Sequence, residues 1–275
     1  MKREKEEKRA LHFIEIPERS AKPRTKGLTL ARDYGIGYYE AQDWMESVGE
    51  FIDFIKIRHI FTLLSPMNKD HLTMRKIQLY RDNDVEVNPG GIVFEMALLS
   101  KKVDECFATM VEMGFSATEI SENMVDMTLD EKVKYTKMAK KRGLKILFEL
   151  GDKYPREPLN VDLAERDIKA LMSQGADLII LERSLIEMCL GQKGESPENG
   201  RLKELVQRVG LEPIVFEAEA VAHQAWLFNT FGPDVNIGPN LEPTYIAKLE
   251  ATRRTLSREG GYTWMSDRLG DDAKR

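Results

Sequence analysis

The chain has 275 residues, of which 42% are hydrophobic and 32% charged, and its formal net charge is −5 at pH 7. Its longest apolar runs, such as Leu178–Leu181, are far shorter than the roughly 18 residues of a membrane-spanning helix, so no membrane partner is expected. The acidic balance also argues against a protein that binds nucleic acid through a broad basic surface. A small anionic ligand is not excluded, because a few Arg and Lys side chains decide such a site locally.

Both ends of the chain are polar. The first ten residues are rich in Lys, Glu and Arg with no apolar segment behind them, which predicts a polar N-terminal extension over residues 1–20, no signal peptide and a cytoplasmic location. Cys106 and Cys189 cannot form a disulfide framework and show no metal-ligand spacing, in keeping with a reducing compartment. Residues 258–275 are expected to be a flexible C-terminal tail. One domain over residues 21–257 is therefore predicted between the extensions.

Glycine introduces most of the predicted strands. It is the expected residue just after a helix, because it enters the left-handed conformation without a Cβ penalty. The runs that follow are nearly continuous apolar stretches, the pattern of strands buried on both faces. In chain order the eight runs begin at or near Gly27, Gly49, Asp84, Gly114, Gly143, Gly175, Gly210 and Gly232.

An amphipathic segment with helical periodicity follows each run. Thr128 with Glu131 three residues later has the pattern of a capping box, and Pro197 suits the start of a helix. The predicted helices are Tyr38–Val48, Asp70–Asn83, Phe94–Met113, Thr128–Arg142, Asp162–Gln174, Glu198–Val209, Glu219–Thr230 and Glu242–Arg258.

This alternation predicts an α/β protein with a single (β/α)₈ TIM-type barrel. Eight βα units in about 240 residues fit such a barrel better than a doubly wound sheet. The rival, a Rossmann-type sheet, would need a glycine-rich phosphate loop after the first strand. The segment from Asp33 to Gly37 lacks the third glycine and the spacing of that loop.

Reacting groups in a TIM barrel come from the C-terminal ends of the strands. Most of the predicted strand ends carry a carboxylate, and such a ring would repel itself unless cations share the space. Lysine, arginine and a hard divalent ion such as Mg²⁺ are able to supply that charge. The strand-end residues are Asp33, Lys56, Gly90 and Gly91 with Glu95, Glu119 and Ser121, Glu149 with Lys153, Glu182 with Arg183, Glu217, and Asn236 with Gly238.

Each of these residues also has a structural interpretation. A strand-end carboxylate is often the partner of a neighbouring Lys or Arg, or the cap of the next helix, and Lys56 is able to extend from its strand end without any role in chemistry. Gly90 and Gly91 form either a tight turn or an anion site, because free backbone N–H groups before a helix suit an anion. Asn236 and Gly238 lie on the eighth predicted strand, where barrel enzymes often hold phosphate.

Several phrases of the chain occur together, in order, in one known family. From about Pro23 to Leu256, the chain resembles the phosphosulfolactate synthases, which open coenzyme M biosynthesis by adding sulfite to phosphoenolpyruvate. The resemblance implies a (β/α)₈ barrel, a Mg²⁺ requirement, small anionic substrates and a homo-oligomer. The phrases are KPRTKGLTLARDYGIG, FIDFIKI, VNPGGIVFE, GFSATEIS, ILFELGDK, GADLIILER, IVFEAEAVAHQAWLFNTFGPDVNIG and LEATRRTL.

The family chemistry implies roles for the strand-end residues. Attack of sulfite on C3 places charge on the substrate carboxylate, where Mg²⁺ would stabilise it as a Lewis acid, and C2 must then be protonated. Lys153 is the expected acid and Lys56 an electrostatic partner. The expected metal ligands are Asp33 and Glu95, with Glu119 and Glu149 as competitors. The expected substrate contacts are Gly90, Gly91, Ser121, Arg183, Arg58, Asn236 and Gly238.

Four loops depart from the family pattern. After Lys56 the family usually continues with a Gly-Trp-Gly-Thr-like turn, whereas Ile57–Phe61 reads Ile-Arg-His-Ile-Phe, and the loops after the fourth, fifth and sixth strands also differ. Changed loops on a kept scaffold are what altered substrate choice would produce. Three hypotheses follow: a Mg²⁺-dependent lyase that makes (2R)-phospho-3-sulfolactate, a divergent barrel enzyme for another carboxylated or phosphorylated metabolite, and a non-enzymatic, stress-related member of the family.

Overall fold

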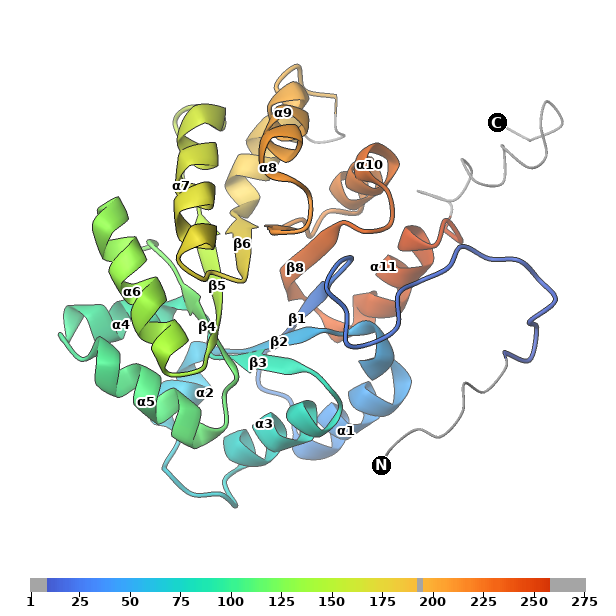
Figure 1. Ribbon diagram of the computed structural model, residues 1–275. Coiled ribbons are helices and arrows are strands. Elements are labelled where there is room, and N and C mark those ends of the chain that lie inside the picture. The colour runs from blue at the N-terminus through green and yellow to red at the C-terminus, as the bar shows by residue number, and fades with distance from the viewer. Residues whose placement is uncertain (1–8, 192–194, 258–275) are drawn as a thin grey trace, which may run out of the picture.

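Eight parallel strands form the centre of the molecule in the computed structural model, which describes residues 9–191 and 195–257. The helices lie around them as an outer ring (Figure 1). This arrangement confirms the predicted single (β/α)₈ barrel. The strands are β1 (Thr29–Asp33), β2 (Phe54–Ile57), β3 (Glu86–Asn88), β4 (Ala117–Ile120), β5 (Lys145–Leu150), β6 (Leu178–Leu181), β7 (Ile214–Phe216) and β8 (Asn236–Leu241).

The barrel is nearly closed. Hydrogen bonds join neighbouring strands in the order β3-β2-β1-β8-β7-β6-β5-β4, which leaves β3 and β4 as the two edges. Two bonds connect these edges: the Ser116 amide donates to the Val87 carbonyl at 3.1 Å, and the Val87 amide donates to Ser116 Oγ at 3.0 Å. The C-terminal ends of all eight strands therefore meet around one mouth.

The helices follow the predicted order, with three differences. The predicted helix Phe94–Met113 is two helices, because Lys101 has a positive φ of 58° and interrupts it. Two short helices, α2 and α8, lie in βα loops where none was predicted. The helices are α1 (Tyr38–Ser47), α2 (His59–Leu64), α3 (Leu72–Asp82), α4 (Gly91–Leu99), α5 (Val103–Met113), α6 (Leu129–Lys141), α7 (Val161–Ser173), α8 (Arg183–Leu190), α9 (Asn199–Val209), α10 (Val221–Phe231) and α11 (Ile246–Arg253), with 3₁₀ turns η1 (Gly49–Phe51) and η2 (Pro243–Tyr245).

Two apolar clusters hold the layers together. The larger one lies between the strands and the helices, and the smaller one fills the inside of the barrel. Both exist because successive side chains of a strand point to opposite faces, so a strand covered on both sides must be apolar throughout. Each fully buried side chain of this kind contributes about 1.5–3 kcal/mol. The inner cluster consists of Leu28, Leu30, Phe54, Ala117, Leu147, Leu178, Ile180 and Val215.

A network of charged side chains lies at the base of the barrel, the end opposite the mouth. Arg253 of α11 is fully buried and donates to the carbonyl of Val235, while Glu250 of the same helix forms an ion pair with Arg19 at 3.1 Å. Residues before β1 therefore pack against the base of the barrel, beginning at least at Arg19.

No helix among the described residues is long and apolar enough to cross a membrane. The predicted C-terminal tail, residues 258–275, lies outside the described residues, as do residues 1–8 of the predicted N-terminal extension.

Candidate active site

Polar side chains stand above the inner apolar layer, at the C-terminal end of the barrel. Side chains two positions apart in a strand share a face, so Arg32 follows Leu30 into the barrel and Glu217 follows Val215. The register of β1 with β2 sets Arg32 beside Lys56. The residues that continue the inner face in this way are Arg32, Lys56, Glu119, Glu149, Glu182 and Glu217.

Most of these side chains line a cavity of about 80 Å³ at the mouth. The cavity has a basic half, supplied by β1 and by β2 with the loop after it, and an acidic half, supplied by β4, β5 and β7. Its lining residues are Arg32, Lys56, Ile57, Arg58, His59, Pro89, Gly90, Gly91, Ile92, Glu119, Asn123, Glu149, Lys153, Glu217 and Asn240.

Lys56 lies where the two halves meet. Its Nζ is 3.2 Å from Glu119 Oε2, and the other oxygen of Glu119 accepts the Gly91 amide at 3.0 Å. Gly90 has φ +78°, and a Cβ there would lie 3.1 Å from Lys56 Cδ. Glycine is therefore needed at position 90 both for the turn and for the close approach of Lys56.

The acidic half holds more carboxyl groups than its cation balances. Within the part of the chain that the structure describes, no Lys or Arg forms an ion pair with Glu149 or Glu217. Burial and the charge of Glu119 raise the pKa of Glu149 to about 7. Burial and a hydrogen bond with Glu182 raise the pKa of Glu217 to about 9. These buried carboxyls repel one another, so the acidic half favours protons or an added cation.

Two arginines of the basic half, Arg32 and Arg58, have no carboxylate partner among the described residues. The Arg32 guanidinium lies over the Tyr34 ring at 4.6 Å, and its Nη1 donates to Asn240 Oδ1 at 3.3 Å. Its Nε is buried and has no hydrogen-bond partner among the described residues. Burial and the charges of Arg32, Arg58 and Lys56 lower the pKa of His59, so its ring is neutral at pH 7. This half favours an anion.

The four expected metal ligands divide into two pairs. Glu119 and Glu149 line the cavity. Asp33 points to the helix layer instead, where it accepts hydrogen bonds from Lys76 at 2.6 Å and from the Tyr80 hydroxyl at 2.9 Å. No group of three or more His, Cys, Asp or Glu side chains is arranged as a metal site in residues 9–191 and 195–257.

Glu95, the remaining expected ligand, is occupied by the loop after β4. It accepts the amides of Asn123 and Met124, at 3.0 and 2.6 Å, and the hydroxyl of Ser121. Ser121, an expected substrate contact, is thereby bound to a carboxylate. Together Glu95 and Ser121 hold the loop that brings Asn123 to the cavity.

Besides Ser121, three expected substrate contacts do not line the cavity. Asn236 is the first residue of β8, at the opposite end of the barrel, where its Oδ1 accepts the Leu28 amide at 2.8 Å. A Cβ at Gly238 would lie 2.4 Å from Leu30 Cβ, so this glycine permits β8 to pack on β1. Arg183 is exposed and pairs with Glu219 at 3.4 Å. Because β8 continues to Leu241, Asn240 rather than Asn236 reaches the mouth.

Sequence reasoning missed Arg32, Asn123 and Asn240 and gave Glu217 no role. The period-two alternation would have found two of them, since it continues from Leu28 and Leu30 to Arg32 and passes from Val215 to Glu217. The expected contacts Gly90, Gly91 and Arg58 and both expected catalytic lysines do line the cavity.

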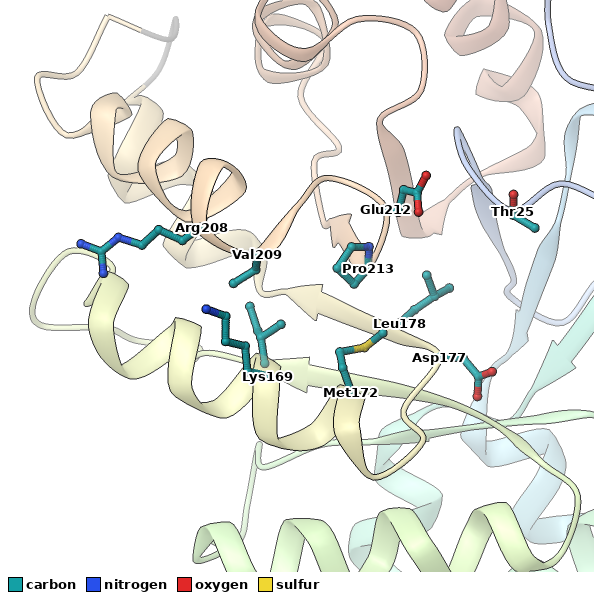
Figure 2. A pocket seen from close by; sticks show the side chains of 10 residues that line it. Thr25, Lys169, Met172, Asp177, Leu178, Arg208, Val209, Glu212 and Pro213 are labelled. Atoms are coloured by element: carbon teal, nitrogen blue, oxygen red, sulfur yellow. The ribbon is translucent and has the colours of Figure 1, made fainter.

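A larger cavity of about 390 Å³ lies at the opposite end of the barrel, between α7 and α9 (Figure 2). Its floor is apolar, with Met172, Leu178 and Pro213. The cations at its rim are already paired, Lys169 with Glu165 and Arg208 with several carboxylates. Its cations therefore differ from Arg32 and Arg58 at the mouth of the barrel, which have no carboxylate partner among the described residues.

Residues 17–259 match the family model described as (2R)-phospho-3-sulfolactate synthase (ComA). The phosphosulfolactate synthase of Methanothermobacter thermautotrophicus is 35% identical over 90% of this chain and 95% of its own length. That of Methanocaldococcus jannaschii is 31% identical over 84% and 92%. The Arabidopsis thaliana protein HEAT-STRESS-ASSOCIATED 32 is 22% identical over 88% and 90%.

Solved structures support the fold. A type I 3-dehydroquinate dehydratase from Clostridium difficile superposes with a TM-score of 0.53 at 10% identity, covering 82% of this chain and 91% of that protein. At this identity the likeness concerns the barrel alone.

Proposed function

Because this chain belongs to the (2R)-phospho-3-sulfolactate synthase family, we propose that it is an enzyme that adds sulfite to phosphoenolpyruvate at the mouth of its barrel. It would be a lyase working in the direction of C–S bond formation. The observation that carries the proposal is the division of the cavity into a basic and an acidic half. A small substrate with two anionic groups is able to place one group against the arginines of the basic half. The other group would then contact a metal cation held by the carboxylates of the acidic half.

The acidic half is the proposed Mg²⁺ site, with Glu119 and Glu149 as ligands. Mg²⁺ is commonly held by one or two carboxylates with waters and substrate oxygens, so two carboxylates fit it. The repulsion between these carboxylates, which contributes to the raised pKa of Glu149, is the kind that a bound cation relieves. When bound, Mg²⁺ would supply Lewis acidity at the substrate carboxylate.

The two cavity lysines are the proposed catalytic residues. Lys56 is buried between the halves, where its charge is able to stabilise the aci-carboxylate that forms as sulfite attacks C3. Lys153 lies exposed at the rim and is the proposed donor of the proton to C2. The proton on Lys153 is then regained from solvent.

The test mixes the purified protein with phosphoenolpyruvate and sulfite, with and without Mg²⁺, and follows the phosphorus NMR spectrum. We expect a new phosphate-ester resonance that requires all three components, and Lys56→Ala should abolish it. No turnover by wild-type protein shown to be folded by circular dichroism would reject the reaction.

A divergent enzyme for another anionic metabolite is the second candidate. It is favoured by α2, the short helix after the β2 strand, because Arg58 and His59 at its start line the cavity where the family pattern differs. A non-enzymatic, stress-related role is the third, in line with the similarity to the heat-stress-associated plant protein. Thermal-shift screening of small anions separates these two, since a ligand of the native state raises the melting temperature.

We also propose that the chain is a cytoplasmic homo-oligomer. Both cysteines are free, as a reducing compartment favours. The packed helices α2 and α4 expose an apolar face, defined here as Ile60, Leu63, Leu64, Met96 and Leu99, with exposed fractions from 42% to 74%. Contiguous exposed apolar side chains of this kind mark interaction surfaces.

A further inference from the structure

We propose that Arg32, with Arg58 and His59, forms the subsite that recognises a phosphate dianion. This subsite would select, among small carboxylate substrates, those that also carry a phosphate group. The inference rests on the proposed function for the identity of the whole substrate, but phosphate binding is measurable without any turnover. Arg32 lies within the phrase KPRTKGLTLARDYGIG, but the resemblance to the family implies no role for it.

The surroundings of Arg32 leave its charge available. Arg183, which follows the end of β6, is tied to the carboxylate of Glu219. Arg32 is held instead by the Tyr34 ring at 4.6 Å and by the neutral amide of Asn240 at 3.3 Å. Ring stacking and one amide contact fix the plane of the guanidinium without neutralising it.

The donors of Arg32 are also incompletely used. Guanidinium presents five N–H donors in a fixed fork, which matches the oxygens of a phosphate. In the described residues Nη1 has its contact with Asn240, and Nε is buried with no acceptor. A buried donor without an acceptor is costly, so a small movement of the side chain toward a bound anion would be favoured.

Neighbouring groups favour an anion of two charges. Arg58 and His59 line the same half of the cavity, and Lys56 lies beyond them beside Glu119. Burial and the charges of Arg32, Arg58 and Lys56 lower the pKa of His59. Its ring is therefore neutral and is able to donate one N–H to an oxygen without adding charge. Arg32 and Arg58 together match the two charges of a phosphate monoester.

The acidic half opposite fixes the orientation of the ligand. Glu119, Glu149 and Glu217 would repel a phosphate and are suited to a carboxylate only through an intervening cation. In phosphoenolpyruvate both groups are attached to C2, so the phosphate lies against Arg32 when the carboxylate faces the acidic half. Sulfite must remain mobile enough to attack C3, so the tightly held anion is the phosphate.

The primary test follows the ring resonances of His59 by NMR, in a chain with four histidines. Inorganic phosphate or phosphoenolpyruvate should raise the pKa of His59, because a bound dianion offsets the charges that lower it. Pyruvate and sulfite at equal concentration should not. Arg32→Gln should abolish the phosphate effect, whereas Arg142→Gln, which removes an exposed Arg paired with Asp104 on the outside of the barrel, should retain it.

The kinetic arm applies if the proposed reaction is observed. Arg32→Gln should raise the KM for phosphoenolpyruvate roughly 10- to 100-fold, the range of a charge-assisted hydrogen bond, and leave the KM for sulfite unchanged. The KM of Arg32→Lys for phosphoenolpyruvate should lie between those of the wild type and Arg32→Gln, because lysine keeps the charge but lacks the forked N–H donors of arginine.

Three outcomes would overturn the assignment. They are an unchanged phosphate response in folded Arg32→Gln, a response of wild-type His59 to sulfite rather than phosphate, and an equal rise in both KM values. Loss of turnover with an intact phosphate response would reject the proposed reaction but keep the subsite.

Discussion

At the scale of single residues, the direction in which each strand-end side chain points decides its role. Asp33 and Arg32 are neighbours in β1, yet Asp33 joins Lys76 in the helix layer and Arg32 lines the cavity. The carboxylate thereby anchors α3 to β1, while the guanidinium is free for a ligand. A position at a strand end is therefore not enough to identify a site residue. The alternation of side chains along the strand must also direct the residue into the barrel rather than toward the helices.

Lys153→Ala should lower turnover about 100-fold or more, the range of general acid catalysis, with the melting temperature nearly unchanged. The side chain is exposed at the rim and has no ion pair in the described residues, so its loss removes no buried contact. Steady-state kinetics and a thermal melt measure the two effects. Lys137→Ala, an exposed lysine of α6, is the control and should alter neither. Parallel losses of activity and stability in Lys153→Ala would point to a structural residue.

At the scale of elements, the carboxylate of Glu250 ties α11 to the segment before β1. It forms ion pairs with Arg19 and Arg254, and it is the acid beside the buried Arg253. Burial alone would raise the pKa of Glu250, but Arg19, Arg254 and Arg253 outweigh it and hold the pKa below its ordinary value of 4.5. The base of the barrel is thus stabilised only while Glu250 is ionised.

Glu250→Gln should destabilise the protein by about 3 kcal/mol at pH 7, because it leaves buried guanidinium charge uncompensated. The folded-state pKa is depressed, so this stabilisation is present above pH 4.5 and is lost as the pH falls through the lower folded value. Urea denaturation of the wild type and of Glu250→Gln, at pH 7 and at a pH below the folded-state pKa of Glu250, measures this difference in the free energy of unfolding. Glu105→Gln, which removes one partner of an exposed pair with Lys102, should leave the free energy of unfolding nearly unchanged. A pH-independent difference for Glu250→Gln would contradict the argument.

The elements themselves were largely predictable, and the exceptions have local causes. The capping box of Thr128 and Glu131 begins α6 as expected. The break between α4 and α5 was missed, because Lys101 takes a left-handed conformation that only glycine or asparagine would have signalled. Helix α2 was missed because its four apolar residues are the exposed ones and its one buried residue, Thr62, is polar, so it has no amphipathic pattern that faces the core.

At the scale of the whole molecule, the net charge of −5 has little bearing on the cavity. The acidic residues that matter are gathered at β4, β5 and β7, opposite the arginines supplied by β1 and the loop after β2. The interaction between charged groups this close together depends on their separation and burial, and the net charge of the chain does not determine it.

Leu64→Glu should dissociate the proposed homo-oligomer. Leu64 is the most exposed residue of the apolar face on α2 and α4, at 74%, and a buried unpaired charge there would oppose association. Analytical ultracentrifugation should show a smaller species than wild type. Leu163→Glu, a substitution of a half-exposed leucine on α7, should leave the mass unchanged. A monomeric wild-type protein would contradict the proposal.

The sequence by itself determined the eight βα units, the barrel and the family, because glycine after each helix and continuous apolar runs are local patterns that survive divergence. It also selected Lys56, Glu119, Glu149 and Lys153 among the residues of the cavity. Only the tertiary structure decided that Asn240 replaces Asn236 at the mouth and that Glu95 and Ser121 bind each other. It also decided that Arg32, which has no carboxylate partner among the described residues, lies opposite the carboxylates of the cavity. These facts depend on where each strand ends and on which side chains meet across the barrel, and contacts between residues distant in the chain leave no local pattern in the sequence.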